Sequence, residues 1–128
     1  MMEESELHCK VTVRIMADKK AFGPGVAALL RGVRDCRSLQ GAARQMDMSY
    51  SKAWTVIREA ERIWGFPLTE CRVGGRRGGG SVLTVQGEEI LRRYDDMEEA
   101  VKAVAEEQFD RFFSRSELEK LRAGEVEL

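Results

Sequence analysis

The sequence predicts a mainly α-helical domain with a small β wing, of the α+β class, followed by a long C-terminal helix. Three observations support this fold class. Apolar residues recur at three- and four-residue spacing in four segments between residues 24 and 113, which is typical of amphipathic helices. Two β-like runs, LTECRV and SVLTV, flank a glycine-rich stretch. Only two prolines occur in 128 residues, so long irregular segments are not expected.

The first elements are a strand and a helix. Val11, Val13 and Ile15 alternate with polar residues, a period of two that predicts a half-buried strand. Pro24 suits the first turn of a helix, where its missing N–H has no partner to lose. This helix is expected to run to about Cys36, with one apolar face made of Val26, Leu29, Leu30 and Val33.

Two further helices follow closely. Ser38 is a candidate N-cap for a short helix whose inward residues are Leu39, Ala42, Ala43 and Met46. Ser49 is the candidate N-cap of the next helix, and Gly65 is placed to end it, with Pro67 just beyond. The apolar stripe of this second helix consists of Ala53, Val56, Ile57, Ala60, Ile63 and Trp64.

The two β-like runs predict a long hairpin, because glycines tolerate the positive φ angles of turns. A helix is then expected from Gly87 to about Phe113. At 1.5 Å per residue it would be about 40 Å long, so one small domain cannot cover all of it and its far half needs a partner. The last segment, SRSELEKLRAGEVEL, is a candidate for a short helix followed by a tail; a partner site and disorder are the alternatives.

The charge distribution is uneven. The chain has a net charge of −1, which alone argues against a nucleic-acid partner. Residues 31–77, however, contain ten basic and five acidic residues, a net charge of +5 that leaves −6 for the rest. A basic middle between acidic ends is consistent with a localised surface for an anionic partner.

Several classes of protein are not indicated. No apolar run approaches the length of about 18 residues that a membrane span needs, and the acidic, polar N-terminus is not a signal peptide. Cys9, Cys36 and Cys71 show no CxxC spacing and His8 is the one histidine, so we expect reduced thiols in or near the core, no disulfide and no metal site. Nothing beyond their presence supports Cys36 or Cys71 as a redox switch. No nucleophile–base pair is evident, so we expect neither enzymatic activity nor a cofactor.

The order of elements predicts a helix-turn-helix followed by a wing. In this motif the first residues of the second helix face base edges in the major groove of DNA. Hydroxyls, an aromatic tip and an amine can contact bases and phosphates, and here they belong to Ser49, Tyr50, Ser51, Lys52 and Thr55. Arg58 and Arg62 lie off the apolar stripe and are candidates for the DNA backbone. Trp54 and Trp64 are expected in the core, with base stacking as the alternative.

The stretch RVGGRRGGGSVLT is a candidate wing. Glycine lets a ribbon tip approach DNA closely, and Arg72, Arg76 and Arg77 would meet phosphates or enter the minor groove. A nucleotide-binding loop is an alternative, but the stretch lacks the G-x-x-x-x-G-K-[ST] pattern and joins strand to strand. A solvated hairpin loop without a ligand is the other alternative.

The long helix carries an apolar stripe that predicts an oligomer interface rather than a ligand pocket. Its interface candidates are Ile90, Tyr94, Met97, Val101, Val104 and Phe109. The acidic residues on its outer face are expected to be a solubilising surface that also repels DNA.

The pattern resembles a known family. The signatures GPG…LL, GAARQMDMSYSKAW and PL…R..GG..GGGS..LT..GEE.L, within about residues 8–105, look like the N-terminal DNA-binding domain of the molybdenum-dependent ModE family. The resemblance implies a winged helix-turn-helix that dimerises through its N-terminal strand, with Val11 and Val13, and through its long helix. It also implies a palindromic operator. Full-length regulators of this family carry molybdate-binding domains after the long helix. This chain ends at Leu128, so we expect a stand-alone DNA-binding domain with no molybdate site.

We therefore expect four segments: a flexible N-terminus (1–8), a winged helix-turn-helix domain (9–86), a dimerisation helix (87–113) and a tail (114–128). The predicted function is that of a cytoplasmic, homodimeric transcriptional regulator that binds double-stranded DNA. A winged-helix module that pairs with another protein, without reading DNA, is the alternative.

Overall fold

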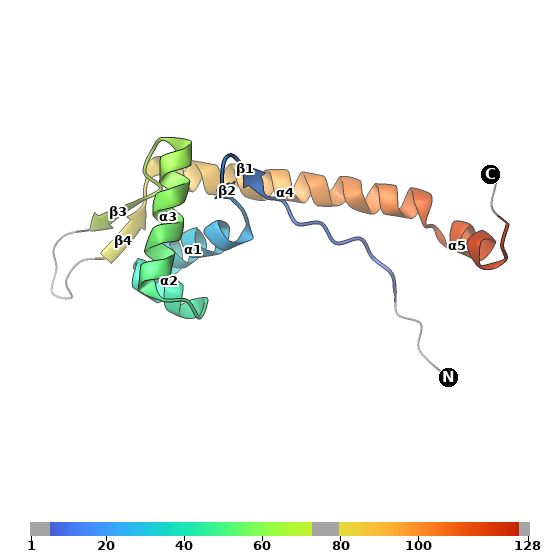
Figure 1. Cartoon of the computed structure of the whole chain (residues 1–128), viewed down its shortest axis with the longest axis horizontal. Coiled ribbons are helices and arrows are strands. Elements are labelled where there is room, and N and C mark those ends of the chain that lie inside the picture. The colour runs from blue at the N-terminus through green and yellow to red at the C-terminus, as the bar shows by residue number, and fades with distance from the viewer. Residues whose placement is uncertain (1–5, 73–79, 126–128) are drawn as a thin grey trace. The chain divides into compact units, whose positions relative to one another are not determined.

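A computed structural model describes residues 6–72 and 80–125 of the chain. Figure 1 shows the order of the elements. They are β1 (Ile15–Met16), β2 (Lys20–Phe22), α1 (Pro24–Cys36), α2 (Leu39–Gln45), α3 (Tyr50–Trp64), β3 (Thr69–Arg72), β4 (Gly80–Leu83), α4 (Val85–Phe112) and α5 (Arg115–Arg122). The predicted fold class is confirmed: three helices precede a two-stranded antiparallel wing, and a long helix follows.

The chain divides into two compact units. One is Thr12–Asp96, which contains the three helices, both small sheets and the first turns of α4. The other consists of residues up to Val11 together with those from Met97 onward. The first turns of α4 pack into the core of the first of these units through Ile90, Leu91 and Tyr94; the expected domain boundary between residues 86 and 87 stays a prediction.

The core of the Thr12–Asp96 unit lies between α1, α2, α3 and the start of α4. Phe22 and Tyr94 pack ring against ring with centroids 4.9 Å apart, and the Tyr94 hydroxyl donates to the backbone carbonyl of Val13 at 2.8 Å. The predicted inward residues of α1 are all buried. The wider core consists of Phe22, Val26, Ala27, Leu29, Leu30, Val33, Leu39, Ala42, Ala43, Ala53, Ile57, Ala60, Leu68, Ile90, Leu91 and Tyr94.

The close approach of α1 and α2 depends on small residues. A Cβ atom placed on Gly32 would lie 2.7 Å from the Cβ of Ala42, which is closer than two such atoms can pack. Ala42 and Ala43 are both buried. The prediction that Ala42 and Ala43 point inward is confirmed.

The predicted helix ends are confirmed. The Ser38 hydroxyl accepts from the Gly41 N–H at 2.9 Å, and the Ser49 hydroxyl accepts from the Lys52 N–H at 3.1 Å. Each hydroxyl satisfies one of the first N–H groups of its helix, which have no partner inside the helix. Gly65 ends α3 in the left-handed conformation, with φ of 86°.

The wing is anchored to the turn between α1 and α2. β3 and β4 pair in antiparallel register, from Thr69 opposite Leu83 to Arg72 opposite Gly80. The N–H of Ser81 donates to the carbonyl oxygen of Arg37 at 3.0 Å. A Cβ on Gly80 would lie only 2.5 Å from that oxygen, so glycine is needed there. The candidate DNA contacts Arg76 and Arg77 lie outside the described residues.

The long helix begins two residues earlier than expected, at Val85. Thr84 explains the difference: its hydroxyl accepts from the Gly87 N–H at 2.9 Å and donates to the Pro67 carbonyl at 2.7 Å. Thr84 therefore caps α4 instead of continuing the strand. The predicted short helix near the C-terminus is present as α5, which begins after the N-cap Ser114.

The N-terminal strand is shorter than expected. Only Ile15 and Met16 pair, with β2, while Val11 and Val13 lie outside any described strand. Their half-buried positions still alternate with exposed Thr12 and Arg14. The expectation that the cysteines lie in or near the core is wrong for Cys9 and Cys71, which are exposed; Cys36 is half-buried.

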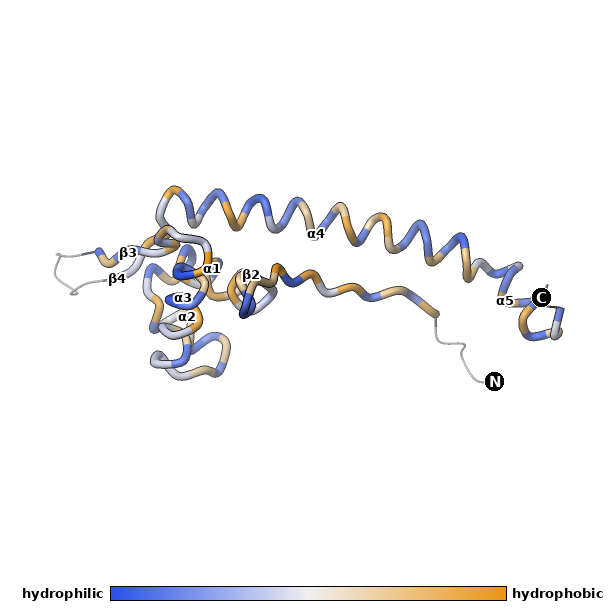
Figure 2. The backbone as a smooth tube through the Cα atoms, turned by 45° about the horizontal axis from the view of Figure 1, so that its top comes forward, coloured by the Kyte–Doolittle hydropathy of each residue, from blue (hydrophilic) through white to orange (hydrophobic). Residues whose placement is uncertain are grey.

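The second unit contains little buried surface. Polar and apolar residues alternate along α4 (Figure 2), and its later apolar side chains are largely exposed. The described residues of α5 include none that is buried. No helix in the described ranges has the length and apolar character that crossing a membrane requires.

Candidate nucleic-acid interface

The outer face of α3 is the centre of the candidate site. Ala53, Ile57 and Ala60 point into the core, so the opposite face of the helix is free for solvent or a partner. The exposed residues there include Ser51, Trp54, Thr55, Arg58 and Arg62. A helix with one buried and one exposed polar face can lie in the major groove without disturbing its own domain.

The N-terminus of α3 is suited to an anion. Tyr50 and Lys52 are exposed, and the first turn contains no acidic residue. Because unpaired N–H groups at a helix start carry partial positive charge, a phosphate is favoured there. The Ser49 hydroxyl already accepts from Lys52 N–H, so its main role in this structure is to cap the helix.

The hydroxyl of Thr55 is partly engaged within α3. It donates to the Ser51 backbone carbonyl at 3.0 Å, one turn earlier. The Thr55 oxygen can still accept a hydrogen bond, and its methyl group can contact an apolar base edge.

Arg58 is held by its own domain. Its guanidinium donates to the carboxylate of Glu61 at 2.6 Å and lies over the ring of Trp54, 5.2 Å from the centroid. Glu61 is 9% exposed, and its other carboxylate oxygen accepts from the backbone N–H of Leu68 at 2.7 Å and, at 3.4 Å, from that of Thr69. Arg58 therefore neutralises a buried carboxylate that connects α3 to the base of the wing.

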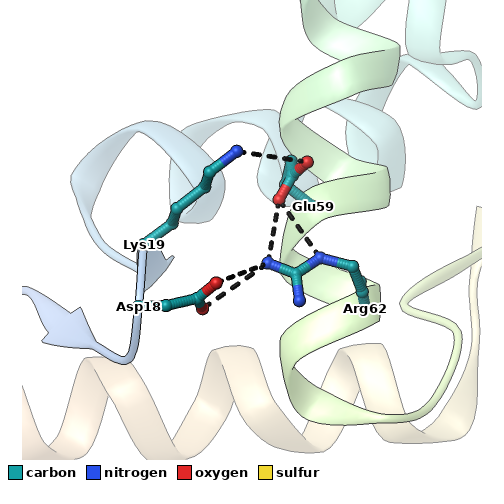
Figure 3. A network of polar contacts seen from close by, with 4 residues as sticks. All are labelled: Asp18, Lys19, Glu59 and Arg62. Atoms are coloured by element: carbon teal, nitrogen blue, oxygen red, sulfur yellow. Dashed lines mark hydrogen bonds and ion pairs between the residues drawn. The ribbon is translucent and has the colours of Figure 1, made fainter.

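Arg62 is also engaged, in the network of Figure 3. It donates to Glu59 and, at 3.2 Å, to Asp18 in the turn between β1 and β2; Lys19 pairs with Glu59 at 3.8 Å. Desolvation opposes ionisation of Asp18, but the Arg62 charge, together with hydrogen bonds from Arg62 and from the backbone at Lys19 and Asp18, outweighs it and lowers the pKa of that carboxyl. Arg62 forms ion pairs with two carboxylates, so it is a weaker candidate for contact with a DNA phosphate than the sequence predicts.

The two tryptophans of α3 lie in different surroundings. Trp64 is half-buried, and its indole N–H donates to the Ala21 carbonyl at 2.9 Å, as expected of a core residue. Trp54 is 46% exposed, so the expectation that it lies in the core is wrong. Trp54 follows Ala53 directly and lies outside the apolar series 53, 57 and 60. This spacing predicts an exposed position, whereas the apolar side chain of tryptophan suggests a buried one.

The wing contributes one described arginine. Arg72 is exposed at the end of β3, opposite Gly80. Its part in DNA binding stays a prediction.

The candidate interface residues of α4 separate into two groups. Ile90 and Tyr94 are 8% and 2% exposed and belong to the core of the protomer, which leaves them little surface for a partner; their part in a dimer interface stays a prediction. The same apolar stripe continues with Met97, Val101 and Val104, which are 38%, 37% and 54% exposed. Phe109 is half-buried and stacks on Phe113 with ring centroids 5.6 Å apart.

An open pocket of about 590 Å³ lies beside the start of α4. It is lined by Arg34, Val85, Glu88, Glu89, Leu91, Arg92, Asp95 and Asp96. Hydrogen bonds from Arg92 and Arg93 lower the pKa of Glu89 to about 2. Within residues 6–72 and 80–125, no group of three or more histidine, cysteine or acidic side chains could hold a metal ion.

Comparison with known proteins agrees with this geometry. Residues 27–88, from α1 to the first turn of α4, match the family described as bacterial regulatory helix-turn-helix protein, lysR family. This segment of the chain is therefore similar to the helix-turn-helix of that family.

The relatives specify the class further. The transcriptional regulator ModE of Haemophilus influenzae is 36% identical over 75 residues, which is 59% of this chain and 29% of that protein. The DNA-binding transcriptional dual regulator ModE of Escherichia coli K12 is 32% identical over 95 residues, 74% of this chain and 34% of that protein. The molybdenum-pterin-binding protein MopB of Rhodobacter capsulatus is 32% identical over 62% of this chain and 30% of that protein.

The domain is thus a ModE-like helix-turn-helix domain, and the resemblance seen in the sequence is confirmed. The chain spans about a third of the length of these curated relatives.

Proposed function

We propose that this chain is a sequence-specific DNA-binding transcriptional regulator that acts as a homodimer on a palindromic operator. The observation that carries the proposal is the outer face of α3, whose N-terminal turn is exposed, basic at Lys52 and free of acidic residues. Relatives named as transcriptional regulators, matched over the same domain, support it. Action on DNA implies a cytoplasmic location.

In this mechanism the start of α3 enters the major groove. Ser51, Lys52 and Thr55 contact base edges and neighbouring phosphates, and Tyr50 lies at the groove edge. Phosphate contacts supply affinity, which makes binding salt-dependent. Arg72, Arg76 and Arg77 of the ribbon contact the DNA backbone, and Arg58 supports the recognition helix through Glu61.

The second copy is proposed to bind the exposed stripe of α4. Met97, Val101 and Val104 repeat at helical spacing with at least a third of each side chain exposed, which is costly for an isolated helix and suits a helix–helix contact. Two-fold symmetry would place two recognition helices in successive major grooves, about 34 Å apart or a multiple of it. Val11, Val13 and Phe109 remain candidates for the same interface.

The test of DNA binding is a fluorescence anisotropy titration against DNA from the chain's own promoter region and against scrambled DNA, at two salt concentrations. We expect tight, sequence-selective binding that weakens with salt. A parallel titration with molybdate tests the expectation that this chain has no molybdate site. Weak binding that ignores sequence would contradict the proposal and favour a protein-pairing module.

The test of dimerisation is sedimentation equilibrium of a variant with Val101→Glu and Val104→Glu. We expect it to be monomeric and to lose affinity for the palindrome. Ala103→Glu is the matched control, since it adds the same charge to the same turn of the helix but off the apolar stripe. A dimer that survives both stripe substitutions would exclude this interface.

A further inference from the structure

We propose that Trp54 reads a thymine in the major groove, contacting its C5-methyl group and donating an indole hydrogen bond to O4. This inference rests on the proposed function and names a base that the recognition helix selects. Three observations carry it: the exposure of the ring, the free N–H and the contacts that hold the ring in place.

Trp54 remains exposed although the Arg58 guanidinium lies over its ring. Its side chain is 46% exposed on the same helix whose other tryptophan is half-buried and hydrogen-bonded. A large ring with one polar atom at its edge is typical of residues that contact a partner at an interface. It lies one turn after Tyr50 and beside Thr55, on the face that carries the candidate DNA contacts.

The indole offers a combination of groups that matches one base. Among the described residues, the Trp54 N–H has no hydrogen-bond acceptor, whereas the N–H of Trp64 has one. In the major groove only thymine presents an apolar group, its C5-methyl, next to an acceptor, O4. An apolar ring with a single donor at its edge is complementary to both members of that pair, whereas a purine offers an acceptor without the apolar group and cytosine offers a donor.

A chain of contacts holds the ring in place from below. The backbone N–H of Leu68 donates to the buried carboxylate of Glu61, which accepts from Arg58, and the Arg58 guanidinium covers the ring of Trp54. A ring fixed before binding loses less side-chain entropy when it meets DNA. Arg58 is thus a positioning residue for Trp54: its guanidinium binds the Glu61 carboxylate and at the same time lies over the Trp54 ring.

The experiment begins with selection of the preferred operator from random DNA by the unaltered protein. Each thymine is then replaced by deoxyuridine, which removes the methyl group alone. We expect one symmetric pair of thymines at which the replacement weakens binding about fourfold per half-site, the value of one buried methyl group. Trp54→Ala should bind the thymine operator more weakly and should no longer distinguish thymine from deoxyuridine at that pair.

Two further variants separate positioning from contact. Arg58→Ala should weaken discrimination at the same pair while circular dichroism shows a folded protein, and Arg58→Lys should restore part of it. Leu121→Ala, which removes an exposed apolar side chain of similar exposure from α5, should leave the discrimination unchanged. A Trp54→Ala variant that still distinguishes thymine from deoxyuridine would overturn the inference while the DNA-binding function stands. Failure of the selection to enrich any sequence would overturn the proposed function and the inference with it.

Discussion

The buried carboxylate of Glu61 accepts a hydrogen bond from the backbone N–H of Leu68 at 2.7 Å, which connects the last turn of α3 to the chain that enters the wing. The same carboxylate binds Arg58 through its other oxygen. One side chain therefore fixes where the recognition helix ends and where the ribbon begins.

Glu61→Gln should destabilise the domain, because it removes the charge that Arg58 neutralises while keeping the shape of the side chain. The expected loss in the free energy of unfolding is about 1–3 kcal/mol, the value of a charged hydrogen bond. Urea unfolding followed by circular dichroism measures it. Glu70→Gln, the same change at an exposed position of β3, is the control and should lose less than about 0.5 kcal/mol. Equal losses in the two variants would show that the burial of Glu61 is unimportant.

Ser49→Ala should weaken the start of the recognition helix by about 1 kcal/mol, because the Lys52 N–H loses its acceptor. Thermal unfolding gives the change. Ser51→Ala, two residues later, serves as the comparison because Ser49 and not Ser51 caps the helix, and it should leave the melting temperature nearly unchanged. A Ser49→Ala protein as stable as the parent would mean that water caps the helix equally well.

Gly80→Ala should destabilise the wing, since a Cβ there would lie 2.5 Å from the Arg37 carbonyl oxygen and the Ser81–Arg37 hydrogen bond would be displaced. We expect a loss of about 1–3 kcal/mol, as for other overpacked sites. Gly25→Ala, in the first turn of α1, has room for the methyl group and should be neutral or stabilising. Chemical denaturation of both variants decides the matter, and a tolerated Gly80→Ala would show that the ribbon can move away from the turn.

Lys52→Ala and Arg62→Ala should differ in their effect on the salt dependence of DNA binding. Lys52 is exposed with no described ion pair, so its loss should reduce the slope of log affinity against log salt by about 1. Arg62 is already paired with Asp18 and Glu59, and its removal should leave the slope nearly unchanged. Anisotropy titrations at several salt concentrations give both slopes. The reverse order would mean that Arg62 exchanges its carboxylates for a phosphate on binding.

The pH dependence of stability should reflect Glu89. Hydrogen bonds from Arg92 and Arg93 lower its pKa in the folded protein from 4.5 to about 2. Because the folded pKa is the lower one, the stabilisation is present above pH 4.5 and is lost as the pH falls toward 2. The stability advantage of the parent over Glu89→Gln should therefore shrink across that interval. Carboxyl NMR titration measures the pKa directly, and a value near 4.5 would contradict the ion pairs seen here.

Much of the fold could be predicted because it depends on local patterns. The N-caps Ser38 and Ser49, the stop at Gly65 and the apolar series 53, 57 and 60 are signals within one or two helical turns, and the structure confirms them. The end of the second β-like run is harder to predict from the sequence, because threonine is common both in strands and at helix N-caps, and Thr84 fits either. Only its distances to Pro67 and Gly87 decide between the two.

The candidate site is harder to predict from the sequence than the fold, because the exposure of a side chain depends on tertiary contacts. An apolar stripe in a sequence does not show which part of it the protein itself buries. Ile90 and Tyr94 are buried within the protomer, whereas Val101 and Val104 on the same helix are exposed. Likewise Arg58 and Arg62 are basic residues on an outer face, yet their carboxylate partners lie three residues away and, for Asp18, in another element. The assignment of recognition residues 49–55 to DNA stays a prediction.

The contact between Gly32 and Ala42 restricts the side chains that both positions can hold. A methyl group on Gly32 would collide with Ala42, so α1 and α2 can keep this close approach only while both positions hold small side chains. The Arg31 guanidinium of α1 is bound to the Asp95 carboxylate of α4. The two helices that precede the recognition helix are therefore joined to the first turns of α4 by this ion pair as well as by the buried core.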